Sequence, residues 1–194
     1  MEPCRIAADN LACRRGERVL FAGLWLALES GQACHVTGPN GTGKSSLIRI
    51  LAGLLRPFAG SVTRAGSLGL VDERLALDEH MPLGRALAFW KRLDGCHDNT
   101  RALEAMQLTD LLDVPVRYLS TGQRKRAALA RLLDGGRQIW LLDEPFNGLD
   151  AEARQGLEAL IALHCGGGGI ALVASHQPIA LPGVTALHLP DYAA

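Results

Sequence analysis

Apolar runs alternate along the chain with segments whose apolar residues recur at helical spacing. Four runs have the apolar, β-branched composition that is typical of buried strands: residues 33–37, 138–142, 170–174 and 184–189. The segment after Gly43, KSSLIRILAGL, carries leucine and isoleucine at helical spacing and reaches Gly53 near its end. This alternation predicts an α/β fold with a largely parallel sheet covered by helices.

Shorter extended pieces surround this first strand-and-helix unit. They predict an antiparallel β flap made of residues 5–11, 19–28, 61–64 and 67–71. Helical patterns then follow one another without a strand between them, at 82–94, 100–106 and 123–133. These patterns predict an α-helical insert between two strands of the main sheet.

The 194 residues can form one α/β domain that needs neither disulfides nor metals to bury a core. No segment has the composition of a linker, so we expect a single domain of residues 1–194. Its core is expected at about 1–72 and 136–194, with the helical insert at about 73–135.

Composition and charge exclude several classes of protein. Lysine plus arginine number 20 and aspartate plus glutamate number 20, so no bulk field indicates nucleic acid or an anionic membrane. The longest apolar stretch, 19–28, is about half the ~20 residues of a membrane-spanning helix, and the amino terminus lacks a secretory signal pattern. We therefore expect a cytosolic protein.

Five scattered cysteines without zinc spacing are expected to be reduced and structural: Cys4, Cys13, Cys34, Cys96 and Cys165.

The segment that joins the strand at 33–37 to the following helix fits the phosphate-loop pattern GxxxxGK[ST]. Glycines let consecutive backbone N–H groups converge on phosphates at a helix start. Lys44 is expected to contact the β and γ phosphates, and Ser45 to give an oxygen to Mg²⁺. The expected nucleotide-binding residues here are Gly38, Pro39, Asn40, Gly41, Thr42, Gly43, Lys44, Ser45 and Ser46. The predicted fold is a P-loop NTPase (RecA-like) core with an antiparallel β flap and an inserted α-helical subdomain.

The run IWLLDE is an apolar strand that ends in two adjacent carboxylates before Pro145. Carboxyl ends of parallel strands face the crevice in which α/β proteins bind ligands. We expect Asp143 to meet Mg²⁺ and Glu144 to polarise the water that attacks ATP. The alternative, a solvated loop start, is disfavoured because a phosphate loop occurs in the same chain.

A third motif separates families of P-loop proteins. The segment LSTGQ resembles the LSGGQ signature of ATP-binding cassette (ABC) proteins and opens a basic helix at 124–131. The resemblance implies that the signature closes on the γ-phosphate held by an opposite subunit; its residues are Leu119, Ser120, Thr121, Gly122 and Gln123. Asp150 falls where the family has its D-loop, and His176 where it has a switch histidine that contacts the γ-phosphate. The position of the basic helix favours a solvated or subunit-facing role, so no nucleic acid is expected.

Two positions depart from the family pattern. The family has a glutamine on the loop that joins core and insert, but this chain has no glutamine between Gln32 and Gln107, and Asp72 or Glu73 occupies that region. Arg15 stands where the family places an aromatic residue against adenine. A guanidinium plane can stack on a base, so we expect a weaker adenine platform there.

Within the ABC family the chain resembles the ATP-binding subunits of the cytochrome c maturation (haem export) system. The resemblance is carried by RGERVLFAGL, by the phosphate-loop and signature segments, by IWLLDEPFNGLDAEARQGLEALIALH and by SHQP. It implies ATP as substrate, Mg²⁺ as cofactor and an ATP-dependent homodimer. It also implies a peripheral position on the cytoplasmic face of a bacterial inner membrane, with membrane-spanning permease subunits as partners.

Three other interpretations stay open. The chain could energise a different small-substrate exporter, or act as a soluble ABC ATPase on ribosomes or DNA. Such soluble relatives usually carry two cassettes or a coiled-coil insert, and this sequence has neither. A P-loop kinase would need an acceptor site or lid in place of LSTGQ.

Overall fold

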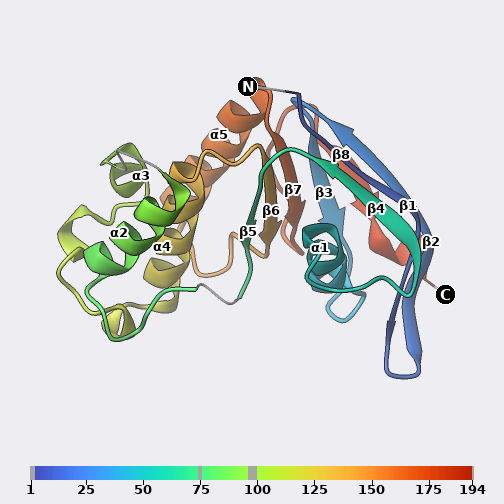
Figure 1. Cartoon of the computed structure of the whole chain (residues 1–194), viewed down its shortest axis with the longest axis horizontal. Coiled ribbons are helices and arrows are strands. Elements are labelled where there is room, and N and C mark those ends of the chain that lie inside the picture. Colours follow the sequence, from blue (N-terminus) through green and yellow to red (C-terminus); the bar gives the residue numbers. More distant parts are fainter. Residues whose placement is uncertain (1–2, 74–75, 96–99, 194) are drawn as a thin grey trace.

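The computed structural model describes residues 3–73, 76–95 and 100–193, and it contains two sheets with helices around them (Figure 1). Five parallel strands form the main sheet in the order β5-β6-β7-β3-β8. Their bounds are β3 Ala33–Thr37, β5 Leu68–Val71, β6 Ile139–Asp143, β7 Ile170–Ala174 and β8 Thr185–His188. The second sheet is antiparallel, in the order β2-β1-β4, with β1 Arg5–Arg15, β2 Arg18–Glu29 and β4 Ala59–Ala65. The predicted fold class is therefore confirmed.

The helices occupy different places around the main sheet. They are α1 Lys44–Ala52, α2 Leu83–Asp94, α3 Thr100–Ala105, α4 Thr121–Asp134 and α5 Ala151–Gly166, with 3-10 turns at Thr109–Leu111, Val116–Tyr118 and Leu189–Tyr192. Figure 1 shows α2, α3 and α4 together at one end of the molecule and the antiparallel sheet at the other, with the main sheet between them. The division into a core and an insert at about 73–135 stays a prediction, which this arrangement supports.

Both faces of the main sheet are buried, because alternate residues of its strands enter two separate apolar clusters. On β6, Trp140 and Leu142 pack in the cluster that contains residues of α2, α3, α4 and α5. Ile139 and Leu141 pack in the cluster that contains α1 and the antiparallel sheet. Successive side chains of a strand point to opposite faces, so a continuous apolar run is what a doubly covered strand requires.

The sequence pattern by itself places one strand in the wrong sheet. Residues 67–71 were expected in the antiparallel flap, but β5 pairs in parallel with β6, from Leu68 opposite Ile139 to Val71 opposite Leu142. Gln138 explains the pairing, because its side-chain Oε1 accepts the Ser67 N–H at 2.9 Å and its own N–H donates to Ser67 Oγ at 3.1 Å. These contacts fix the start of β5 beside β6, and the sequence pattern carries no signal for them.

The helix that follows the signature is less solvated than expected. On α4, Lys125 and the four residues 127–130 are buried against the rest of the molecule.

The described cysteines, Cys4, Cys13, Cys34 and Cys165, are free and buried, while Cys96 lies outside the described residues. None of the helices in the described ranges has the length and apolar character that crossing a bilayer requires.

A histidine links α5 to the main sheet through an aromatic stack. The imidazole of His164 lies 3.7 Å from the indole of Trp140, centroid to centroid, and its Nε2 lies 3.2 Å from the Gln138 carbonyl oxygen. Burial lowers the pKa of His164 below its ordinary value near 6.5, although hydrogen bonds with the backbone of Ile170 and Gln138 oppose the shift. A proton on His164 therefore favours the unfolded chain.

We predict that the free energy of unfolding falls as pH drops from about 6.5 towards the lowered pKa of His164. In this range the unfolded chain binds a proton on His164 that the folded chain does not bind, and this proton uptake favours unfolding. In His164→Phe this fall should be smaller, since phenylalanine keeps an aromatic ring on Trp140 and does not titrate. In this structure the Gln138 carbonyl also accepts the Ile170 N–H at 2.8 Å, so it should keep a hydrogen-bond partner in the variant. Urea unfolding at pH 7.5 and 5.5 measures the difference.

The matched control is His80→Phe, because His80 is exposed. It should leave the pH dependence as in the wild type. Some dependence should survive in His164→Phe, because burial also lowers the pKa of His35. An unchanged pH dependence in His164→Phe would contradict the assignment.

Candidate functional site

The phosphate-loop segment leaves the end of β3 and enters α1 in a tight wrap. Gly38, Gly41 and Gly43 have φ values of 147°, 82° and 107°, which favour glycine. A Cβ on Gly38 would lie 2.9 Å from Pro190 Cδ, and one on Gly43 would lie 3.1 Å from the Phe21 ring. The loop therefore needs glycine both for its conformation and for the space around it.

Lys44 begins α1 and turns back over the loop. Its Nζ donates to the carbonyl oxygens of Gly38 at 2.8 Å and Pro39 at 3.3 Å. The same nitrogen lies 3.6 Å from Glu144 Oε1, and the residue is only 6% exposed. The ammonium group thus joins the loop to the strand that carries the two acids.

Glu144 directly follows β6 in a strained conformation. Its φ is 46°, in a region that few non-glycine residues occupy, and its N–H donates to the Ala174 carbonyl at 2.8 Å. This turn places Oε2 2.9 Å from Nδ1 of His176. One carboxylate therefore contacts both Lys44 and His176, which come from separate elements at the carboxyl edge of the sheet.

Asp143 is the last residue of β6 and is only 2% exposed. Burial raises the pKa of this carboxyl, a hydrogen bond from the Ser45 hydroxyl lowers it, and the charge of Glu144 raises it. Its Oδ1 atom is buried and has no hydrogen-bond partner among the described residues. A buried carboxylate oxygen beside a serine hydroxyl fits a hard cation such as Mg²⁺, which takes oxygen ligands.

The loop that carries His176 is held by an arginine that the sequence analysis missed. Arg154, near the start of α5, donates through Nη1 to Gln177 Oε1 at 2.8 Å and through Nη2 to the Pro178 carbonyl. Gln177 Nε2 also donates to Asn147 Oδ1 at 3.5 Å, so this loop is tied to the segment after the acid pair. Nothing in the sequence pattern distinguishes Arg154 from a solvated helix residue.

The signature segment forms the amino-terminal cap of α4. Ser120 Oγ accepts the Gln123 N–H at 3.2 Å, and Gln123 Oε1 accepts the Ser120 N–H at 2.8 Å, which is a capping box. Asp150 caps α5 in a similar way by accepting the Ala153 N–H at 2.8 Å. Gly122 approaches Gly148 so closely that a Cβ on Gly122 would lie 2.3 Å from the Gly148 carbonyl oxygen.

The signature segment and the phosphate loop do not meet within one chain. Among the described residues, no hydrogen bond or ion pair joins 119–123 to 38–45, and Figure 1 shows α4 and α1 with β5 and β6 between them. The site that the family resemblance predicts between two copies of the chain stays a prediction.

The two departures from the family pattern have different surroundings. Asp72 is buried and pairs with Arg49 Nη2 at 3.3 Å, whereas Glu73 is exposed. Arg15 Nε donates to Ser46 Oγ at 3.4 Å, which places Arg15 beside the first turn of α1. The stacking of Arg15 on adenine stays a prediction.

Comparison with known proteins identifies the class of protein to which this fold belongs. The family model of the ABC transporter matches residues 21–147. A solved structure, a putative ABC transporter ATP-binding protein from Pyrococcus furiosus, superposes with a TM-score of 0.86 at 20% identity and covers 98% of this chain and 100% of its own. The fold and the family match define an ABC-type ATPase.

Curated relatives indicate which family of ABC-type ATPases this chain belongs to. The chain is 55% identical over 192 residues to the cytochrome c biogenesis ATP-binding export protein CcmA of Novosphingobium aromaticivorans, covering 99% of both chains. It is 53% identical to the protein of the same name from Sphingopyxis alaskensis, covering 94% of this chain and 95% of the relative. The chain therefore belongs to the CcmA family of ABC transporter ATPases, in which ATP hydrolysis is coupled to transport.

We predict that Gly122→Ala lowers the free energy of unfolding by about 1–3 kcal/mol, because the added methyl group must push the start of α4 away from the Gly148 carbonyl. Urea denaturation measures the change. The matched control is Gly156→Ala on α5, where a Cβ meets nothing within 4 Å. That variant should gain about 0.5–1 kcal/mol, as alanine does in a helix. Equal gains in both variants would contradict the close contact.

Proposed function

We propose that this chain is the ATP-hydrolysing subunit of an export system for cytochrome c biogenesis, with haem delivery as the step that it energises. The observation that carries the proposal is the 55% identity to a CcmA protein over 99% of both chains. Retention of the complete strand–loop–helix unit and of both acids supports an active ATPase rather than an inactive relative. The relatives' name gives export for cytochrome c biogenesis, and haem as the exported species follows from the resemblance of the sequence motifs to the haem-export subgroup.

In the proposed reaction, Glu144 orients and deprotonates the attacking water. Its carboxylate lies 2.9 Å from His176 and 3.6 Å from Lys44, so a phosphate at the loop would have both nitrogen groups and the base at one place. Lys44 would exchange its contacts with the Gly38 and Pro39 carbonyls for contacts with the β and γ phosphates. His176 would then contact the γ-phosphate while it fixes the side chain of Glu144.

Ser45 and Asp143 are the proposed protein ligands of Mg²⁺. Within the described ranges, no group of three or more His, Cys, Asp or Glu residues could hold a metal. A metal at Asp143 would therefore complete its shell with phosphate oxygens and water, as Mg²⁺ usually does. When bound, the ion would neutralise charge that develops on the phosphates.

Hydrolysis is proposed to require two copies of the chain. The capped start of α4 presents the hydroxyl of Ser120 and backbone N–H groups, which suit a phosphate. Since this segment lies apart from the phosphate loop of its own chain, the γ-phosphate would be closed in by the partner copy. We propose that ATP promotes this homodimer and that ADP releases it.

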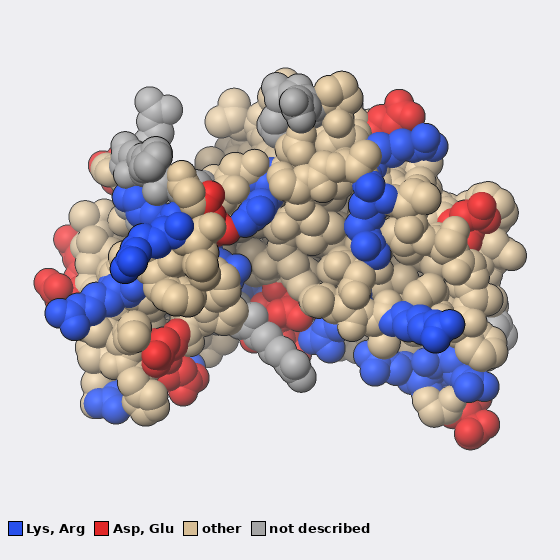
Figure 2. Space-filling model, viewed as in Figure 1, with Lys and Arg blue, Asp and Glu red and all other residues tan. Residues whose placement is uncertain are grey.

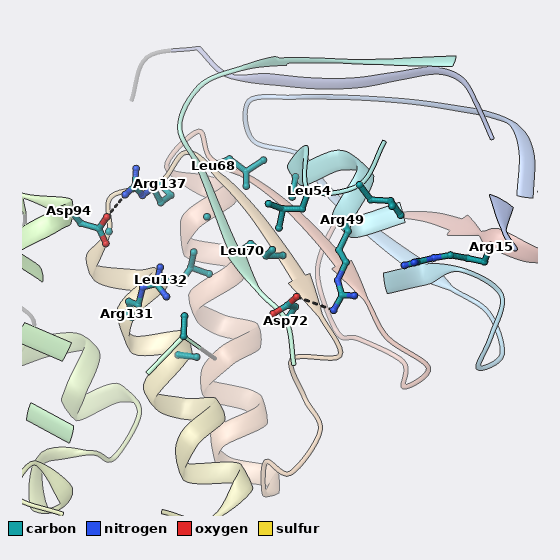
Figure 3. A pocket seen from close by; sticks show the side chains of 16 residues that line it. Arg15, Arg49, Leu54, Leu68, Leu70, Asp72, Asp94, Arg131, Leu132 and Arg137 are labelled. Carbon is teal, nitrogen blue, oxygen red and sulfur yellow. Dashed lines mark hydrogen bonds and ion pairs between the residues drawn. The ribbon is translucent and has the colours of Figure 1, made fainter. Parts of the chain in front are cut away.

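The proposed partners are membrane-spanning permease subunits, which would hold the chain at the cytoplasmic face of the inner membrane. A groove of about 680 Å³ runs between the end of α1, β5 and α4 (Figure 3). Its lining includes five leucines, and it contains more arginines than aspartates. The leucines are Leu54, Leu55, Leu68, Leu70 and Leu132, the arginines are Arg15, Arg49, Arg131 and Arg137, and the aspartates are Asp72 and Asp94. Figure 2 shows basic side chains on both sides of the hollow between the helical end and the rest of the molecule.

Two of these arginines are paired within the groove, Arg49 with Asp72 and Arg137 with Asp94 (Figure 3). The remaining excess of positive charge suits a partner segment that carries acidic and apolar side chains. Leu54 is 68% exposed at the groove, which an apolar side chain of the partner could cover.

We predict that Glu144→Gln lowers ATP turnover by about 10²- to 10⁴-fold, because the amide keeps the size of the side chain and loses the general base. Nucleotide binding should be retained. The matched control is Glu152→Gln on the exposed first turn of α5, which should turn over ATP as the wild type does. Phosphate release under saturating Mg-ATP measures both. Wild-type turnover in Glu144→Gln would refute its assignment as base.

The same variant tests the shared site. With hydrolysis blocked, ATP should hold two copies of Glu144→Gln together, and ADP should not. Light scattering with each nucleotide measures the mass, in the presence of the membrane subunits if the isolated chain stays monomeric. A complex in which neither nucleotide changes the separation of the two chains would contradict the proposed ATP-dependent dimer.

We predict that the tagged chain copurifies with multi-span proteins from detergent-solubilised membranes, and that Leu54→Asp reduces their recovery by about tenfold, since a carboxylate in an apolar contact costs at least ~1.4 kcal/mol. The matched control is Leu163→Asp on α5. Leu163 is 74% exposed and lies outside the lining of the groove, so its variant should recover partners as the wild type does. Recovery with ribosomes or DNA instead of membrane proteins would overturn the transport function.

A further inference from the structure

A lysine of the signature helix reaches the strand that carries the acid pair. Lys125 is only 7% exposed, and its Nζ donates to the backbone carbonyl oxygen of Asp143 at 3.2 Å. The contact joins α4, which starts at the signature segment, to the end of β6. No other described side chain donates a hydrogen bond to the backbone of Asp143.

The surroundings of Lys125 are acidic. Burial lowers the pKa of its ammonium group, and the negative charges of Asp143, Asp72, Glu73 and Glu144 act against that shift, Asp143 most strongly. On the other side, Arg49 of α1 pairs with Asp72 at 3.3 Å. The acidic residues at this edge therefore have two cations from α1, Arg49 at Asp72 and Lys44 at Glu144, and a third from α4.

The carboxylates at this edge need positive charge beside them. Asp72 and Asp143 are both buried, and a buried carboxylate is costly unless a charge or hydrogen bonds compensate it. A neutral side chain on α4 would remove one of the positive charges that act on Asp143, Asp72 and Glu144. A lysine at this position both donates to the strand and supplies the charge.

We propose that Lys125 is a positioning residue for ATP hydrolysis: it holds the end of β6 by the Asp143 carbonyl, compensates the acids there, and couples the signature helix to the acid pair. Any displacement of α4 is then transmitted to Asp143 and Glu144 through one buried hydrogen bond. This inference rests on the proposed roles of Asp143 and Glu144.

The test compares Lys125→Met and Lys125→Arg with the control Arg126→Met. Methionine keeps an unbranched apolar stem and removes the charge, whereas arginine keeps the charge and the donors. Arg126 is the next residue, and its Nη1 donates to Gln107 Oε1 at 2.9 Å, so its variant removes the same charge without touching β6. Each protein is assayed for kcat, for KM of ATP, and for thermal unfolding in EDTA and in MgCl₂ without nucleotide.

In Lys125→Met we expect kcat to fall by about tenfold or more with KM of ATP changed less than about threefold, because small displacements of reacting groups reduce the rate while the phosphate loop is untouched. Lys125→Arg should recover a substantial part of kcat. The control should keep the wild-type kcat.

Thermal unfolding supplies a readout that does not depend on turnover. Because Lys125→Met leaves the acids with less positive charge, Mg²⁺ alone should raise its Tm by about 2 °C more than it raises the Tm of the wild type or of Arg126→Met. A wild-type kcat in Lys125→Met, or a Mg²⁺ response equal to that of Arg126→Met, would overturn the proposal. If Lys125→Met does not fold, Lys125→Gln replaces it in both assays.

Failure of the proposed function gives a different result. In that case the wild type, assembled with its partners, does not hydrolyse ATP or Glu144→Gln hydrolyses it normally. The thermal comparison still decides whether Lys125 compensates the acidic edge.

Discussion

The burial of both faces of the parallel sheet is the constraint on which the site depends. Strands β3, β6 and β7 are apolar along almost their whole length, so charged side chains can lie only where the strands end. The three ends are adjacent, with Val36 and Asp143 both opposite Ala174. The phosphate loop, the acid pair and the loop of His176 therefore meet at one edge of the sheet.

Charges that meet at a buried edge must compensate one another. Lys44, Glu144 and His176 form one such set, with a carboxylate between an ammonium group and an imidazole. Asp143 has the Ser45 hydroxyl beside it but keeps one oxygen without a partner. A buried oxygen atom without a hydrogen-bond partner is available to a ligand, whereas the neighbouring polar atoms already take part in hydrogen bonds within the fold.

The loops at this edge are held by contacts from elements that lie further away. Arg154 on α5 fixes the segment after His176, and Lys125 on α4 contacts the backbone of Asp143. Gly122 brings the signature helix against Gly148, next to the cap of α5. The start of α4 is thus connected to the end of β6 by the Lys125 hydrogen bond and to the segment after the acid pair by the close approach of Gly122 to Gly148.

The nature of the chemistry and most of the fold can be predicted from the order of residues alone. Three local patterns carry the chemistry, which depends on spacing within a few residues. They are the phosphate loop from Gly38 to Ser45, the acids at 143 and 144, and the signature LSTGQ. The apolar runs likewise predicted four of the five strands of the main sheet, because burial on two faces is visible in composition. Three features become visible only in three dimensions: β5 joins that sheet, Arg154 holds the loop of His176, and Lys125 lies among carboxylates. These features depend on contacts between segments that are far apart in the chain, and a local sequence pattern does not indicate which distant segments will be in contact.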